Sequence, residues 1–263
     1  MSLDVKNTKD SASTHSCSLA YGPSGIGKTH AFRTVPADRL LLVVTEGKHG
    51  PLQGYDCDVV DCQTYQEFIG SMRLIKAGLL NKTLEVNGRK KDIIGIDSLS
   101  CLGDLVIQDI LQGKMTAVEG AQVKDFGDVE KLMELQDWGL YSARMKSIIL
   151  AMSSMPCHLI CTCLEALRED KASGRTMFTP NLSGKLALEV PRYFDNVFHA
   201  EWGVDGEGSK IRVWRTVGTD TITAKGHESL GASVLPDWTA VLKSIFGGKK
   251  KAAKKTSKKK ESK

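Results

Sequence analysis

Aromatic residues and long apolar runs are both scarce in this sequence of 263 residues. Phe, Trp and Tyr make up 6% of the chain, so a broad aromatic platform for stacking nucleic-acid bases is not part of its bulk composition. The longest uncharged stretch, counting His158 as neutral, runs from Ser147 to Leu164 and contains Ser, Thr and Pro. A membrane-spanning helix needs about 20 mostly apolar residues. The stretch therefore predicts a buried helix followed by a strand, and no membrane partner is expected.

The N-terminus also lacks the apolar run of an export signal. The seven cysteines are an odd number, which in the absence of export favours reduced thiols and a cytoplasmic protein. Cys157, Cys161 and Cys163 lie near His158, but no second cluster completes a tetrahedral set of metal ligands. We therefore expect packing thiols rather than a metal centre at these positions.

Positive charge is concentrated at one end of the chain. Residues 249–263 contain nine Lys and one Glu and contribute +8, so residues 1–248 carry −3 of the formal net charge of +5. This composition predicts a disordered Lys-rich tail at residues 247–263, which begins with a Gly247–Gly248 hinge. We expect the tail to bind nucleic acid. A solubility tail or a contact with an acidic partner are the alternatives.

Short apolar runs alternate with helical patterns along residues 15–246, which predicts one α/β domain after a flexible leader at residues 1–14. Strands are predicted at 17–21, 40–45, 58–61, 93–97 and 158–163, and helices at 28–34, 65–77, 102–112, 129–155 (with a break near 139) and 237–246. This order implies right-handed crossovers and a mainly parallel, twisted sheet flanked by helices. Residues 165–189 predict a long loop, and residues 196–217 a C-terminal β-hairpin.

The most specific pattern follows the first predicted strand. Residues 22–29 fit G-x-x-x-x-G-K-[ST] at every fixed position, between a strand and a predicted helix. The candidate nucleotide-binding residues are Gly22, Pro23, Ser24, Gly25, Ile26, Gly27, Lys28 and Thr29. Glycines let successive N–H groups turn towards an anion, and the next helix would direct its positive end at the same phosphates. Lys28 is placed for the β- and γ-phosphates and the Thr29 hydroxyl for Mg²⁺. A chance Gly-rich turn is the alternative.

Two carboxylates end neighbouring predicted strands. Asp97 closes the strand at 93–97 and is the second candidate Mg²⁺ ligand, unless it caps the following helix. Glu46 follows the strand at 40–45 and is the candidate that activates water, with a solvated turn glutamate as the alternative. Ser98 occupies the place directly after Asp97 where a catalytic acid would otherwise be expected, so Glu46 is favoured and Glu165 is the next candidate.

The phosphate loop, Thr45–Glu46–Gly47 and Ile96–Asp97–Ser98 together resemble the RecA-like recombination ATPases. The chain is more similar still to the short phage-encoded RecA-like proteins of single-strand annealing. The segments that add to this similarity are 136–139, 158–162, 181–185 and 224–227, and the likeness covers roughly residues 16–242.

This resemblance implies a RecA-like core that binds ATP and Mg²⁺ and hydrolyses ATP on single-stranded DNA. It implies that Glu46 activates water and that Thr162, on the sensor strand, lies near the γ-phosphate. It also implies a homo-oligomer in which Lys225 acts on a neighbouring subunit's nucleotide, although His227 stands where the family pattern has Arg. Single-stranded DNA is expected to meet the loop at 165–189 and the Lys tail at 249–263.

Two other functions fit the same phosphate loop. One is a nucleotide-gated DNA-binding module that hydrolyses almost nothing. The other is a P-loop phosphotransferase, but the sequence shows no lid-like Arg cluster and no site for a small second substrate. The sequence also has no guanine-reading Asn-Lys-x-Asp motif.

Overall fold

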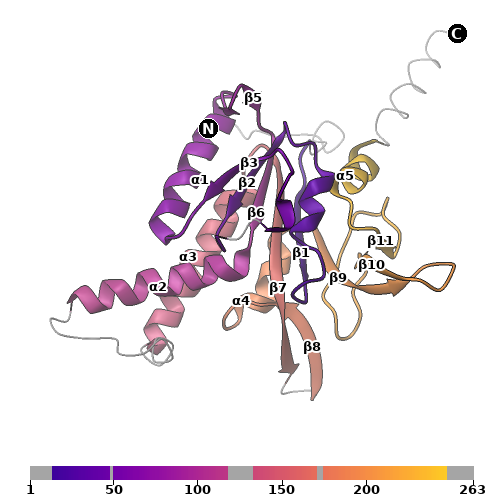
Figure 1. Ribbon diagram of the computed structural model, residues 1–263. Helices are drawn as coiled ribbons and strands as arrows, with labels where there is room; N and C mark the ends of the chain where they lie inside the picture. Colours follow the sequence, from indigo (N-terminus) through magenta and orange to yellow (C-terminus); the bar gives the residue numbers. More distant parts are fainter. Residues whose placement is uncertain (1–13, 48–49, 118–132, 171–173, 248–263) are drawn as a thin grey trace, which may run out of the picture.

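The computed structural model describes residues 14–47, 50–117, 133–170 and 174–247. Within these ranges nine strands form one sheet, in the order β3–β2–β6–β7–β1–β9–β10–β11, with β8 paired to β7 (Figure 1). Its parallel strands are β1 (Cys17–Gly22), β2 (Leu40–Val44), β3 (Asp58–Asp61), β6 (Ile93–Asp97), β7 (His158–Asp170) and β9 (Asn196–Val204). The predicted mainly parallel α/β sheet is confirmed, and β1 lies at its centre between β7 and β9.

The remaining strands are antiparallel to their neighbours. They are β8 (Arg175–Pro180), β10 (Lys210–Arg215) and β11 (Ser233–Val234), while β4 (Glu85–Val86) and β5 (Arg89–Lys90) form a separate small hairpin. The β9–β10 pair confirms the predicted C-terminal hairpin. In its turn, the Asp205 carboxylate accepts hydrogen bonds from the N–H groups of Glu207 and Ser209 at 3.0 and 2.8 Å.

Helices cover both faces of the sheet, and each face has its own apolar core. One face carries α1 (Tyr65–Leu80), α2 (Leu99–Ala117), α3 (Leu135–Ser153), α4 (Leu186–Glu189) and the 3-10 helix η5 (Val190–Tyr193). The other face carries α5 (Trp238–Gly247) and the 3-10 helices η1 (His30–Thr34) and η2 (Gly50–Leu52). Side chains alternate between faces along a strand, so Leu19 and Tyr21 enter the first core and Ala20 the second.

The start of α1 shows how local sequence fixes a helix boundary. The Thr64 hydroxyl accepts a hydrogen bond from the Glu67 N–H, and the Glu67 carboxylate accepts one from the Thr64 N–H. This reciprocal pair satisfies two N–H groups that a helix leaves unpaired at its first turn. Apolar residues at helical spacing then turn one side of α1 into the core, namely Phe68, Met72, Ile75 and Leu79.

The helix predicted at residues 28–34 forms only in part, as the five-residue 3-10 helix η1 (His30–Thr34). It ends where predicted, because Pro36 follows and holds Val35 in an extended conformation (φ −84°, ψ 143°). So few aligned peptide groups make little helix dipole. The dipole of η1 therefore adds little to the backbone N–H groups of the loop and to Lys28 as partners for phosphates.

The long loop predicted at residues 165–189 is also wrong. Strand β7 continues to Asp170 and pairs antiparallel with β8, and this hairpin projects beyond the sheet (Figure 1). It lacks the buried-strand pattern because much of it is solvated, as the 64% exposed Leu167 shows. The predicted break at Gly139 is absent as well, since α3 runs without interruption through that residue.

None of the helices formed by the described residues is long and apolar enough to cross a membrane. Two predicted segments fall largely outside the described residues: the leader, apart from Thr14, and the Lys-rich tail, apart from Gly247. The structure therefore describes the predicted domain, residues 15–246, with the gaps stated above.

Candidate active site

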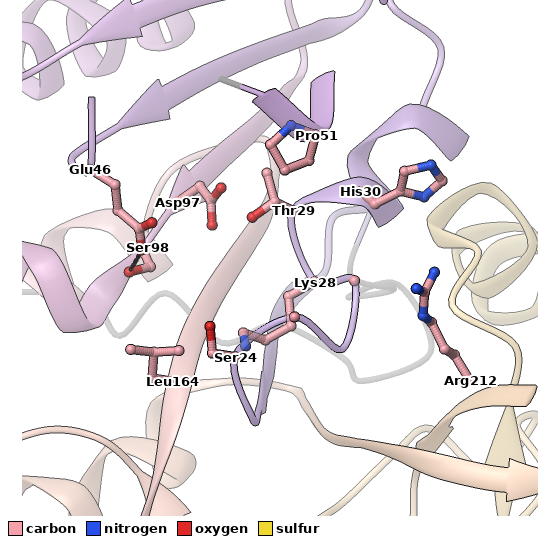
Figure 2. A pocket seen from close by; sticks show the side chains of 12 residues that line it. Ser24, Lys28, Thr29, His30, Glu46, Pro51, Asp97, Ser98, Leu164 and Arg212 are labelled. Carbon is pink, nitrogen blue, oxygen red and sulfur yellow. Dashed lines mark hydrogen bonds between the residues drawn. The ribbon is translucent and has the colours of Figure 1, made fainter. Parts of the chain in front are cut away.

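The predicted phosphate loop and both predicted carboxylates border one cavity of about 370 Å³ at the carboxyl ends of the parallel strands. Open α/β sheets usually bind ligands at this edge. Figure 2 shows the side chains around it. The lining residues are Ser24, Gly25, Gly27, Lys28, Thr29, His30, Glu46, Pro51, Asp97, Ser98, Leu164 and Arg212.

The loop backbone departs from ordinary conformations at two glycines. Gly25 and Gly27 have φ values of 76° and 95°, a region that side-chain-bearing residues rarely adopt. Gly22 is constrained differently, because a Cβ atom there would lie 2.6 Å from the Ala200 carbonyl oxygen of β9. The Ile26 side chain packs into the second core, so this residue can serve a phosphate only through its backbone.

Lys28 lies inside the loop and is 9% exposed. Its Nζ donates hydrogen bonds to the carbonyl oxygens of Gly22 at 2.9 Å and Pro23 at 2.8 Å. Burial lowers the pKa of Lys28 below its ordinary 10.5, while nearby groups, among them Asp97, act in the opposite direction. A partly desolvated ammonium at this point favours an anionic ligand in the cavity.

Asp97 ends β6 with its carboxylate almost fully buried. Burial raises its pKa, and hydrogen bonds from Thr162 and Thr29 partly oppose that shift. Thr162 sits on β7, fully buried, and its hydroxyl donates to Asp97 Oδ1. It does not line the cavity, so the structure places Thr162 behind Asp97 as a residue that orients the carboxylate.

Glu46 follows the end of β2, next to β6, and its side chain is exposed to the cavity. Ser98 Oγ donates a hydrogen bond to Glu46 Oε1 at 2.8 Å, marked by the dashed line in Figure 2. The two strand ends are also tied by Thr45, whose N–H donates to the Asp97 carbonyl at 2.9 Å. Through its hydrogen bond, Ser98, which stands in the place of a second acid, orients Glu46 on the neighbouring strand. The Asp97–Ser98 peptide bond is cis.

Two other candidates lie away from the cavity. Lys225 is exposed and pairs through its backbone with Val197 of β9. Its assignment to a neighbouring subunit's nucleotide stays a prediction, since the structure describes one chain. Glu165 Oε2 accepts a hydrogen bond from His199 Nε2 at 2.8 Å, and Glu165 does not line the cavity.

Five lining residues were not predicted as site residues: His30, Pro51, Ser98, Leu164 and Arg212. His30 directly follows the motif and Leu164 directly follows the strand predicted at 158–163, so their proximity in the sequence could have indicated them. Arg212 and Pro51 reach the cavity only through the folding of the C-terminal hairpin and of η2. No short sequence pattern predicts such long-range contacts.

A Gly-rich loop between a strand and a helical turn, with a lysine, a threonine and a strand-end aspartate at one cavity, defines a P-loop nucleotide-binding protein. In agreement, the AAA domain family matches residues 15–227. The chain belongs to this family of P-loop NTPases, and its fold is a RecA-like core.

Similarity of the chain to individual known proteins is weak. No curated protein shows significant similarity to the chain. Among solved structures, the chain is similar to the flagellar accessory protein FlaH from Methanocaldococcus jannaschii, with 14% identity over 76% of each chain and a TM-score of 0.33. A similarity this weak says nothing about activity or partners.

Proposed function

We propose that this chain is an ATPase that binds ATP with Mg²⁺ and transfers the γ-phosphoryl group to water. The observation that carries the proposal is that Lys28, Thr29, Asp97 and Glu46, from three different parts of the chain, line the same cavity. Lys28 and the loop N–H groups would hold the β- and γ-phosphates. Membership of the AAA domain family supports a nucleotide as the ligand.

The side chains near Lys28 fit a magnesium ion. Thr29 supplies a hydroxyl and Asp97 a carboxylate, which are hard oxygen ligands, and phosphate oxygens and water commonly complete the shell of Mg²⁺. Burial disfavours the charged form of Asp97, so a divalent cation beside it would favour the carboxylate again. When bound, the ion would neutralise charge that develops on the phosphate oxygens.

Glu46 is the residue we assign to the water. Its carboxylate is exposed to the cavity while Ser98 holds Oε1, which leaves the group oriented yet accessible. It would accept a proton from water as the oxygen attacks the γ-phosphorus, and ADP would leave with its β-phosphate held by Lys28.

The test is Glu46→Gln, which keeps the size of the side chain but removes the basic carboxylate. We expect ATP binding to persist while release of free phosphate falls about a hundredfold or more, the usual scale for a lost general base. Glu85→Gln, an exposed carboxylate on β4 that does not line the cavity, is the matched control. A fall of less than about threefold in phosphate release would mean that a group other than Glu46 activates the water. ADP formation that requires an added acceptor, with the phosphoryl group transferred to that acceptor, would favour a phosphotransferase. Near-zero turnover in the wild type would favour a nucleotide-gated binding module.

Single-stranded DNA is the polymer that we propose as the partner, as the similarity to single-strand annealing ATPases implies. The two arginines of the β7–β8 hairpin already have partners within the chain. In the β7–β8 hairpin, Arg168 already donates to the carbonyl oxygens of Leu182 and Gly184, and Arg175 pairs with Asp220 at 3.0 Å. The other region predicted to meet DNA, the Lys-rich tail, carries nine lysines and lies outside the described residues.

A further inference from the structure

Arg212 brings a charged group from the C-terminal hairpin to the phosphate loop. It lies on β10 directly opposite Trp202 of β9, and its guanidinium carbon is 5.4 Å from the centre of the Trp202 ring. The side chain also reaches Gly27, since a Cβ atom at that glycine would lie 3.3 Å from Arg212 Cδ and 3.4 Å from Nε. The indole therefore supports a cation that rests against the loop.

The position of Arg212 follows from the alternation of β10. Trp214, two residues further along the same face, is buried in the second core and stacks on Phe198 with ring centres 5.5 Å apart. Because residues i and i+2 share a face, this anchored tryptophan turns Arg212 to the side of the sheet on which the loop lies. The Arg212 side chain therefore lies between the second core and the cavity.

The cavity has two distinguishable ends. Figure 2 shows Asp97 and Glu46 on one side of Lys28, and His30 and Arg212 on the other. Under the proposed function, the metal ligand and the water-activating group mark the γ-phosphate end. The chain of phosphates runs past Lys28, so the α-phosphate and the nucleoside come to the end where His30 and Arg212 lie.

The positive charge of Arg212 is not neutralised by a carboxylate. Among the residues that the structure describes, Arg212 forms no ion pair, whereas Arg215 on the same strand is paired with Glu201 at 2.7 Å. Arg212 and Lys28 line the same cavity, with Asp97 and Glu46 at its far end, so an anion between the two cations would be stabilised by both. Arginine presents planar N–H donors that suit phosphate oxygens.

We propose that Arg212 binds the α-phosphate of the nucleotide held in the same chain. The inference rests on the proposed ATP site and adds a residue that the P-loop motif does not contain. It makes the C-terminal hairpin part of the nucleotide site, with Trp202 as the residue that positions the guanidinium. Because ATP and ADP share the α-phosphate, Arg212 contributes equally to the binding of both.

The test compares affinities for ADP and for a non-hydrolysable ATP analogue, measured by titration calorimetry in the presence of Mg²⁺. Arg212→Ala and Arg212→Gln should each weaken both ligands by about tenfold, the scale of one charge-assisted contact at a partly exposed site. Arg212→Lys should recover part of the loss. Lys210→Ala is the matched control, because Lys210 also lies over Trp202, at 4.4 Å, but does not line the cavity. Its nucleotide affinities should stay within about twofold of the wild type. Thermal unfolding of each variant establishes that it is folded.

Three results would overturn the proposal. Loss of affinity for the ATP analogue alone would place Arg212 at the γ-phosphate. Equal losses of single-stranded DNA binding in Arg212→Ala and Lys210→Ala, with nucleotide affinity unchanged, would assign this face to nucleic acid. Unchanged affinity in every Arg212 variant, alongside lost affinity in Lys28→Ala, would refute the role of Arg212 and leave the ATP site standing. If Lys28→Ala also bound normally, the proposed function itself would fall.

Discussion

Replacing Lys28 by Ala tests the nucleotide site most directly. The ammonium has three protons, and the carbonyl oxygens of Gly22 and Pro23 already accept two of them at 2.9 and 2.8 Å. If those bonds persist when ATP binds, one N–H remains for a phosphate oxygen. A hydrogen bond between two charged groups contributes about 1.5–3 kcal/mol. We take about 2–3 kcal/mol for the partly buried Lys28, which corresponds to a loss of about 30- to 150-fold in ATP affinity.

The assay is equilibrium binding of ATP with Mg²⁺ by calorimetry, together with thermal unfolding of the free protein. Lys28→Met is the matched variant, because it keeps an unbranched stem in the loop while it removes the charge. Both variants should lose affinity by a similar factor if the ammonium is responsible. If Lys28→Met bound ATP normally while Lys28→Ala did not, the loss would come from collapse of the loop. Wild-type affinity in a folded Lys28→Ala protein would refute the assignment of residues 22–29 as a phosphate site.

Three further predictions concern pH, assembly and the tail. Burial lowers the pKa of His158 from 6.5 to about 4, so folding favours the neutral ring, and the stability that it confers above pH 6.5 is lost as the pH falls towards 4. Denaturant titrations at pH 7 and pH 4.5 should therefore show a smaller loss of stability in His158→Gln than in the wild type, and equal losses would contradict this. If Lys225 completes a neighbour's site, mixing Lys225→Ala with Lys28→Ala subunits should restore part of the ATPase activity that each lacks alone; no recovery in mixed oligomers counts against it. Deletion after Phe246 should make the slope of log DNA affinity against log salt concentration less steep by roughly 3. Each neutralised phosphate of single-stranded DNA contributes about 0.7, and we expect about half of the nine lysines to engage at once. An unchanged slope would assign DNA binding to the domain itself.

The central parallel strands β1, β2 and β6 were predictable because they are buried on both faces. Such strands show as short aliphatic runs, and Leu40–Val44 and Ile93–Asp97 are of this kind. The hairpin of β7 and β8 escaped prediction because beyond Leu164 its side chains are largely solvated, so neither a run nor an alternation marks it. The end of η1 at Thr34 was predicted correctly, since Pro36 restricts Val35 to extended conformations, but its later start at His30 and its 3-10 geometry were not.

For the site, the sequence predicted the groups that belong to a contiguous motif or to a strand end. Lys28, Thr29, Asp97 and Glu46 are of this kind, and all four line the cavity. What it could not predict depends on tertiary packing. Thr162 faces Asp97 rather than the cavity because of the register between β6 and β7. Arg212 reaches the loop because Trp214 anchors its strand.

The close approach of Gly22 to Ala200 affects how variation in this loop is to be interpreted. A side chain at Gly22 would push β1 and β9 apart whether or not a nucleotide is ever bound. Lys28 meets no such steric limit: its buried ammonium is held by the carbonyl oxygens of Gly22 and Pro23, and a bound anion would offset the cost of its burial. A descendant that had abandoned ATP would thus still be selected to keep the first glycine of the motif, yet would be free to exchange the lysine. Among diverged sequences, a conserved Gly22 therefore shows only that the packing of β1 against β9 is kept, whereas a conserved Lys28 indicates that the protein still binds a nucleotide.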